Sequence, residues 1–355
     1  MSHMSPRIRT LGAMVVGLLL IGGPAAADPA GPTHFRSTVT EIVAADDQPV
    51  ALEVEILGGD AFLVVRAAPG TEVDVPGYEA EPYVRIAADG TVEVNTRSPA
   101  RWLNDARFGA ADVDVPPLAD ADAPPEWERV AQDGHYAWYD HRIHFMSPAL
   151  PPTVDVSRNE PQQVLEWTVP LVVDGRDVEV RGVLDWVPGP SPALPVGAVL
   201  LAVAAGVWSS LRRESGLSVA IAVGAVLTGV VGLTSSVGLP PGADAEPALV
   251  VLPALAGGVL VAARIWCRRD AGRSSWLVPA AALPIAIWGV IQWGSLTRPI
   301  VPGPLPSELV LATTAVAFGT AAAALAVVGR RVLAATALDP DLDPDTVERP
   351  TDTGD

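Results

Sequence analysis

Five long apolar segments occupy the second half of the chain, and none of them contains an acidic or basic side chain. They lie at Leu194–Leu211, Leu217–Val237, Ala248–Ala263, Trp276–Trp293 and Leu309–Val328. An apolar helix of about 20 residues crosses the hydrocarbon core of a bilayer, and two of the segments are near the lower limit of that length. The pattern therefore predicts an α-helical transmembrane bundle of five helices over residues 191–332.

The arginines of this region are concentrated after alternate segments. Eight of them follow the first, third and fifth segments: Arg212, Arg213, Arg264, Arg268, Arg269, Arg273, Arg330 and Arg331. By contrast, the connection Gly238–Pro247 has two acids and no base, and Ser295–Glu308 has only Arg298. Because short connections rich in arginine stay in the cytoplasm, we predict a multi-pass plasma-membrane protein with a cytoplasmic C-terminus and an N-terminal part outside.

Short segments with alternating apolar and polar positions fill residues 35–186. The alternation is clearest in Val50–Leu57 and Val178–Leu184, and the Asp-Gly pairs at 89–90 and 174–175 are typical of hairpin turns. The predicted strands are Ser37–Val43, Val50–Leu57, Ala61–Arg66, Thr71–Val75, Tyr83–Ile86, Thr91–Thr96, His135–Met146, Gln163–Val173 and Arg176–Trp186. They predict an all-β, sandwich-like extracytoplasmic domain over residues 28–190, interrupted by a Pro- and Asp-rich loop at 98–127.

Both ends of the chain carry sequences outside these two parts. Arg7 and Arg9 precede the short apolar run Leu11–Ile21, and small residues around Ala27 offer a cleavage site. This arrangement predicts a signal peptide over residues 1–27; the alternative is an uncleaved anchor, which would add a sixth helix. Residues 333–355 are acidic and contain repeated Asp-Pro pairs, which predicts a disordered cytoplasmic tail.

Charge and cysteine content narrow the classes of partner and fold. The net charge is −18, and residues 28–188 hold 29 acids against 11 arginines, so we exclude nucleic acid as a partner. All 23 basic side chains are arginine, which indicates a GC-rich genome of the actinobacterial kind. The single cysteine, Cys267, lies in a predicted cytoplasmic connection. The external domain therefore has no disulfide and must be stabilised by its core.

The segment His135–Met146 concentrates histidines and aromatic residues. If it is a strand, Trp138, Asp140, Arg142, His144 and Met146 share one face, and His141 lies on the other face, toward the core. Imidazole with thioether is a ligand pair that Cu(I) prefers. The candidate metal ligands are His144, Met146, His34 and His135, with Asp140 and Arg142 positioned to orient them.

Other interpretations of this segment stay open. Histidines and aromatic residues on one strand of a sandwich also pack and form hydrogen bonds without binding any ligand. The sequence has no nucleophile elbow, zinc-protease motif, phosphate-binding loop or dinucleotide fingerprint, and we therefore expect no enzymatic activity.

Three stretches of the external domain resemble one family of actinobacterial membrane-anchored proteins. They are Gly77–Ile86, Asp89–Pro99 and Trp138–Met146, and the last matches a motif written W-x-D-H-R-x-H-[WF]-M. The resemblance covers about residues 33–190 and implies a signal peptide, a β domain and several helices, in gene neighbourhoods that handle copper. Position 139 is usually histidine in that family and is Tyr139 here, which removes one potential ligand.

The sequence favours a non-enzymatic, membrane-anchored protein of the cell envelope with a binding or assembly role. Its expected partners are the lipid bilayer and another envelope or membrane protein, with no cofactor required. The alternative is an extracytoplasmic copper-handling protein that uses the His/Met site.

Overall fold

The computed structural model describes residues 30–108, 113–147, 149–213, 215–267 and 276–336. The predicted signal peptide and almost all of the predicted acidic tail lie outside these residues. The chain divides into two compact units. The first, here the β unit, extends to Val187 and includes the distant connection Gly238–Ala245; the second, the helical unit, contains the remaining residues from Pro188 onward.

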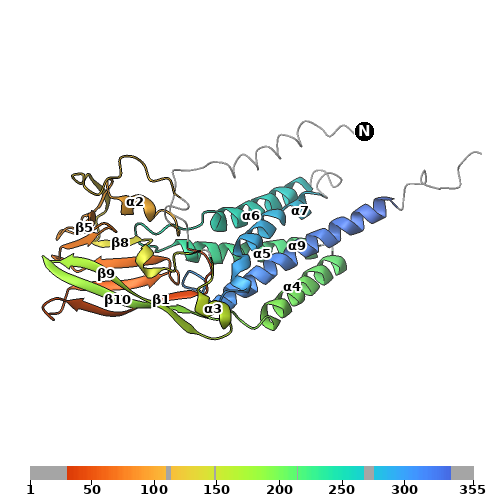
Figure 1. The fold of residues 1–355 in the computed structure, drawn as a ribbon. Helices are drawn as coiled ribbons and strands as arrows, with labels where there is room; N and C mark the ends of the chain where they lie inside the picture. The colour runs from red at the N-terminus through yellow and green to blue at the C-terminus, as the bar shows by residue number, and fades with distance from the viewer. Residues whose placement is uncertain (1–29, 109–112, 148, 214, 268–275, 337–355) are drawn as a thin grey trace, which may run out of the picture. The chain divides into compact units, whose positions relative to one another are not determined.

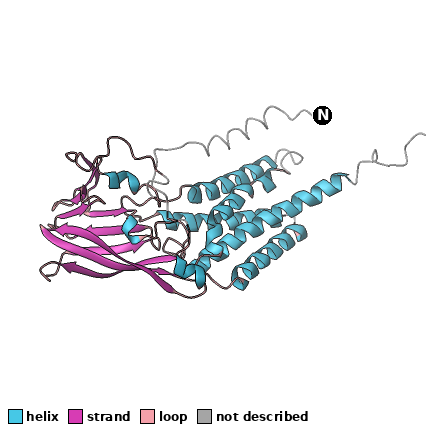
Figure 2. Cartoon of the chain, in the orientation of Figure 1, coloured by secondary structure: helices cyan, strands magenta, loops and turns pink. Residues whose placement is uncertain are grey.

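Ten antiparallel strands form the β unit (Figure 2). They are β1 Phe35–Ala44, β2 Leu52–Leu57, β3 Phe62–Ala67, β4 Val73–Pro76, β5 Pro82–Ile86, β6 Val92–Asn95, β7 Trp127–Ala131, β8 His135–Trp138, β9 Gln162–Val173 and β10 Arg176–Trp186. Seven strands form one sheet in the order β1-β10-β9-β4-β5-β6-β7, and three form another in the order β2-β3-β8. The predicted all-β fold is confirmed.

Turn chemistry and alternation explain the longest hairpin, β9–β10 (Figure 1). Asp174 and Gly175 both have positive φ, 49° and 75°, which a two-residue hairpin turn requires. Inward positions such as Val169 and Val180 are fully buried. They pack in one core with Val65 and Trp138 of the smaller sheet. Two sheets that share a core explain how the β unit is stabilised without a disulfide.

One strand was not predicted, and one predicted strand is much shorter than expected. The sequence Trp127-Glu-Arg-Val-Ala131 forms edge strand β7, whose three central side chains are exposed, so it lacks an apolar alternation that could reveal it. The predicted strand His135–Met146 is a strand only as far as Trp138. The loop at 98–126, between β6 and β7, contains the short helix α2, Pro99–Leu103, and a second short helix, α3, spans Pro152–Val156 before β9.

The helical unit contains five segments long and apolar enough to cross a membrane, and the predicted bundle of five helices is confirmed. The helices are α4 Ala193–Arg212, α5 Gly216–Ser236, α6 Ala248–Cys267, α7 Leu277–Ala280, α8 Leu283–Ile291, the 3-10 helix η4 Gln292–Leu296 and α9 Ser307–Thr336. The fourth segment, Leu277–Leu296, is broken into three pieces, with prolines at Pro279 and Pro284.

Glycines bring the helices of this unit into close contact. A Cβ on Gly206 of α4 would lie 2.6 Å from the carbonyl oxygen of Gly319 in α9, and one on Gly319 would lie 2.5 Å from that of Ala202. Real Cβ atoms do not approach backbone this closely, so both positions require glycine. Small residues at a crossing allow the backbone packing that drives helix association in lipid.

A proline creates a polar contact between helices of the same unit. Pro253 lies inside α6 and has no N–H group, so it cannot donate a hydrogen bond to the carbonyl of Leu249 one turn earlier. The Nε1–H group of the buried Trp288 in α8 donates to that carbonyl instead, at 3.2 Å. The indole thus satisfies a backbone group that would otherwise be unpaired in an apolar environment.

Candidate functional site

The segment that follows β8 folds as a turn because of one side chain. Asp140 caps the 3-10 helix η2, His141–Ile143, and its Oδ1 atom accepts a hydrogen bond from the backbone N–H of Arg142 at 2.9 Å. An aspartate that binds the backbone two residues ahead competes with strand pairing. The expectation that alternate residues from Trp138 to Met146 share one strand face is therefore wrong.

Asp140 is fully buried and every oxygen of its carboxylate is bound. Arg142 donates from Nε to Oδ1 at 2.8 Å and from Nη2 to Oδ2 at 2.6 Å, and Trp138 donates from Nε1 to Oδ2 at 2.7 Å. Burial alone would raise the pKa of Asp140, but the Arg142 guanidinium and these hydrogen bonds outweigh it and hold that pKa below its ordinary value. Asp140 is therefore ionised and paired.

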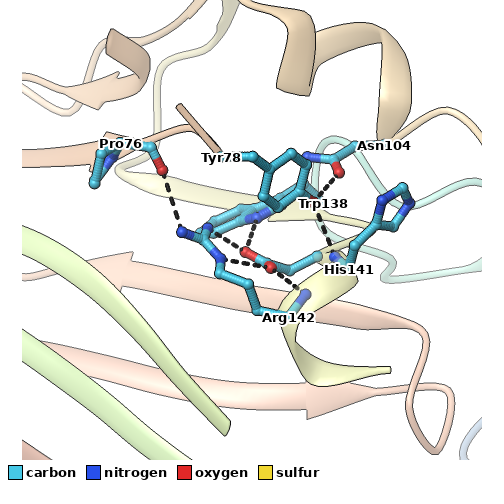
Figure 3. Close-up of polar contacts among 7 residues, drawn as sticks. Pro76, Tyr78, Asn104, Trp138, His141 and Arg142 are labelled. Carbon is cyan, nitrogen blue, oxygen red and sulfur yellow. Dashed lines mark hydrogen bonds and ion pairs between the residues drawn. The ribbon is translucent and has the colours of Figure 1, made fainter. Parts of the chain in front are cut away.

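Two further segments bind this group, as Figure 3 shows. Arg142 donates to the carbonyl of Pro76 at 3.4 Å, and the backbone N–H of His141 donates to the Tyr78 hydroxyl at 2.9 Å. That hydroxyl in turn donates to the Asn104 side chain. We call Pro76, Tyr78, Asn104, Trp138, Asp140, His141 and Arg142 the Asp140 cluster. It connects the β4–β5 turn, the loop at 98–126 and the end of β8.

A second buried carboxylate lies at the turn between β2 and β3. Asp60 is fully buried, and Arg107 binds both of its oxygens, with Nη1 3.2 Å from Oδ1. Arg107 Nη1 also lies 3.4 Å from the Tyr139 hydroxyl. Burial raises the pKa of Asp60, but His144 and Arg107 together lower it below its ordinary value. We call Asp60, Arg107, Tyr139 and His144 the Asp60 cluster.

His144 is the unusual member of the Asp60 cluster. Its side chain is fully buried, and its Nδ1 atom lies 3.5 Å from Asp60 Oδ2, a contact without hydrogen-bond geometry. Neither ring nitrogen has a hydrogen-bond partner among the described residues. Burial lowers the pKa of His144 more than the Asp60 carboxylate raises it. The imidazole is therefore neutral at neutral pH.

The other candidate ligands lie in surroundings different from those of His144. His135 lies at the opposite end of the β3–β8 pair, where it is opposite Arg66, whose Nη2 atom is 3.3 Å from His135 Nε2. Met146 is 42% exposed. His34 stacks on Trp186 with ring centroids 4.3 Å apart, and its Nδ1 atom is 3.0 Å from the carbonyl of Val187. Only His144 lies in a buried polar cluster.

The charges of both clusters disfavour a metal ion. The carboxylates of Asp60 and Asp140 are already neutralised by Arg107 and Arg142, and a cation beside His144 would face the first of these guanidinium groups. Across the described ranges, no group of three or more His, Cys, Asp or Glu side chains could hold a metal ion. Asp140, expected to orient His144, binds Arg142 and Trp138 instead.

Both clusters hold the loop at 98–126, which we call the excursion. Asn104 and Arg107 belong to the excursion and bind Tyr78 and Asp60, respectively. Its first residue is held by Glu81, whose Oε1 atom accepts a hydrogen bond from the Ser98 hydroxyl at 2.6 Å. Sequence reasoning did not identify Asp60, Arg107 or Asn104, because their partners lie 26 to 47 residues away along the chain.

Two surface hollows of the β unit are lined by residues outside both clusters. One is lined by Val50–Glu53 and Arg66–Pro69, and another by Ala67–Pro69, Ala87–Gly90 and Gln132–Gly134. Neither includes a residue of the Asp60 or Asp140 cluster. The hydrogen bonds and ion pairs of both clusters connect the excursion to other parts of the β unit.

Comparison with known proteins gives no further assignment. No protein-family model matches the chain, and neither a curated protein nor a solved structure matches it.

Proposed function

We propose that this chain is a non-enzymatic, membrane-anchored extracytoplasmic protein of the cell envelope whose β unit binds another envelope or membrane protein through the excursion. The helical unit is the anchor, and its contact with the lipid bilayer follows from its five apolar segments. The observation that carries the proposal is that buried polar groups of the β unit bind the excursion at Ser98, Asn104 and Arg107.

The excursion is fixed at its end as well as at its start. The backbone N–H of Asp120 donates to the carbonyl of Arg97 at 2.8 Å, and the Arg97 guanidinium pairs with Glu126 at 2.7 Å. The backbone N–H of Thr96 also donates to the carbonyl of Glu126 at 2.9 Å. A loop already fixed in its bound conformation loses less conformational entropy when it binds a partner.

The outer part of the excursion carries side chains suited to recognition. Val115 and Leu118 are 37% and 45% exposed, although both are apolar. Asp114, Asp120 and Asp122 flank them in the sequence and are exposed as well. Exposed apolar side chains within an acidic rim favour a partner surface that is apolar at its centre and basic at its edge.

The proposal includes an external position for the β unit, which the connection between α5 and α6 supports. The connection Gly238–Ala245 between α5 and α6 belongs to the β unit, where the backbone N–H of Ala137 donates to the carbonyl of Pro241 at 2.8 Å. Gly242 has a φ of 90°, and a Cβ there would overlap the carbonyl of Ala137. This is the acidic connection that the distribution of arginines assigns to the outside.

Site-specific photo-crosslinking tests the proposed interface. A crosslinking amino acid in place of Leu118, in the full chain in native membranes, should give one discrete crosslinked protein product. The same amino acid in place of Thr40, an exposed residue on β1, is the matched control and should not give this product. Addition of Asp114→Arg should reduce the yield from position 118. Equal products from positions 118 and 40 would contradict the proposal.

The second candidate function is copper handling at His144 and Met146. The observation that favours it is the buried His144 ring, whose two nitrogens have no hydrogen-bond partner among the described residues. A buried polar atom without a partner is costly unless a ligand satisfies it.

A further inference from the structure

A groove lies between the beginning of α5 and the end of α6, two helices that run side by side (Figure 1). Its volume is about 450 Å³, within the range of about 300–1,000 Å³ that is typical of small-ligand sites. Its apolar lining includes Val219, Ala222, Val261 and Ile265, and its one cation is Arg264. The groove thus combines a long apolar wall with a single positive charge.

Arg264 lies inside the third candidate membrane span, Ala248–Trp266, less than one turn from its end. No carboxylate of a described residue forms an ion pair with it. Arg212, at the end of α4, differs because its guanidinium lies over the Trp208 ring, 4.0 Å from the centroid. A cation near the membrane interface is stabilised by an anion or by water, and arginine binds phosphate with two parallel hydrogen bonds.

The helix that forms the other wall adds to the positive potential. α5 begins at Gly216, two residues before Ser218, which lines the groove. The N-terminus of a long helix carries about half a positive elementary charge, and its first amides point away from the helix. The Arg264 guanidinium and the N-terminus of α5 lie at the same end of the groove, because the first turn of α5 and the last turns of α6 line it together.

We propose that this groove binds one anionic phospholipid. Its phosphate is bound by Arg264 beside the first turn of α5, and one acyl chain lies along Val219, Ala222 and Val261. A peptide would also need hydrogen-bond partners for its backbone, whereas all but two of the groove-lining side chains are apolar. A lipid matches both features, since it combines one phosphate with an apolar chain, and basic pockets between membrane helices bind such headgroups.

Native mass spectrometry of the full-length protein in mild detergent tests this proposal. With equal amounts of phosphatidylglycerol and phosphatidylcholine, the wild-type protein should retain the anionic lipid about tenfold more strongly, because only that lipid carries a net negative charge. Arg264→Gln should abolish the preference, and Arg264→Lys should restore part of it. Arg212→Gln, which removes a charge outside the groove, is the matched control and should leave the preference unchanged. Inorganic phosphate should not displace the lipid, since it has no acyl chain.

A second variant tests the apolar wall separately from the charge. Ala222 is exposed in the groove, so Ala222→Phe fills the groove without disturbing a buried contact. It should weaken retention of phosphatidylglycerol about tenfold while Arg264 is intact. The proposal is overturned if wild type retains both lipids equally, if Arg212→Gln and Arg264→Gln have the same effect, or if Ala222→Phe retains the lipid as wild type does.

Discussion

At the residue scale, two buried carboxylates explain how the β unit holds its longest loop. Asp60 and Asp140 are both fully buried, and each is paired with one arginine. A buried ion pair contributes little compared with apolar packing, but loss of one partner leaves an uncompensated charge. The two carboxylates therefore contribute by fixing where Arg107 and Arg142 lie, because these partly buried guanidinium groups need a paired negative charge.

Substitution of Asp140 tests this argument. Asp140→Asn keeps the size of the side chain but removes the charge that pairs with Arg142 and replaces one of the two accepting oxygens, which bind Arg142 and Trp138, with an NH2 group. We expect a loss of about 3–5 kcal/mol in the free energy of unfolding, measured by denaturant unfolding of the detergent-solubilised chain. Glu179→Gln, which breaks the exposed pair with Arg181, is the control and should cost less than about 1 kcal/mol. Equal losses would show that the buried pair has no special role.

The protonation of His144 predicts a pH dependence. Burial lowers its pKa in the folded protein, so between that value and the ordinary pKa of about 6.5 only the unfolded chain binds the proton. Stability is therefore greatest above pH about 6.5 and falls as the pH drops below it. Burial lowers the pKa values of His141 and His135 in the same direction. The free energy of unfolding, measured with denaturant at several values between pH 5 and 8, should change less with pH for His144→Gln than for wild type. An equal change with pH in both proteins would contradict this.

Copper titration tests the metal hypothesis at the same scale. If His144 and Met146 bind Cu(I), the wild-type chain should bind it more tightly than the double variant His144→Ala/Met146→Leu, and should prefer Cu(I) to Zn(II). Competition with a chromogenic Cu(I) chelator measures both. Equal affinity of wild type and the double variant would leave the segment with a structural role only, which is the outcome that the nearby Arg107 charge favours.

At the scale of elements, sequence periodicity predicted most strands and all five apolar helices, because both patterns depend on neighbouring residues. It failed where a side-chain hydrogen bond ends a strand and where a strand has no apolar face. The strand predicted for His135–Met146 stops at Trp138, since Asp140 caps η2 and binds Arg142. It also missed β7, an edge strand without an apolar face. The excursion was predicted as a loop, but its anchors Asp60 and Glu81 could not be predicted, because their partners lie 17 to 47 residues away.

The hydrogen bond from Trp288 in α8 to the Leu249 carbonyl in α6 can be tested together with a substitution that compensates for its loss. Trp288→Phe removes the donor for the Leu249 carbonyl, so it should lower the stability of the bundle by about 0.6–1.7 kcal/mol. Pro253→Ala restores a backbone N–H that can bind the same carbonyl. Trp288→Phe should therefore cost less in the Pro253→Ala background, as measured by SDS-induced unfolding of the full chain. Equal costs in both backgrounds would rule out this compensation.

At the scale of the whole molecule, the chain joins a β unit with its own core to a helical unit with its own core. The chain enters the β unit a second time at Gly238–Ala245, between α5 and α6. A connection that packs with β8 must lie on the same side of any membrane that these helices cross. The acidic connection and the β unit are therefore expected outside, and the arginine-rich connections inside.

Reporter fusions test this central claim most directly. A periplasmic-type reporter enzyme that is active only outside the membrane should be active when fused after Val187 or after Gly242, and inactive after Arg213 or Arg331. A fluorescent protein that folds only inside should give the opposite result at each position. We expect Gly242 to lie outside, because its connection packs with β8. A cytoplasmic signal from the Gly242 fusion would contradict both the five-helix topology and the proposed external site of binding.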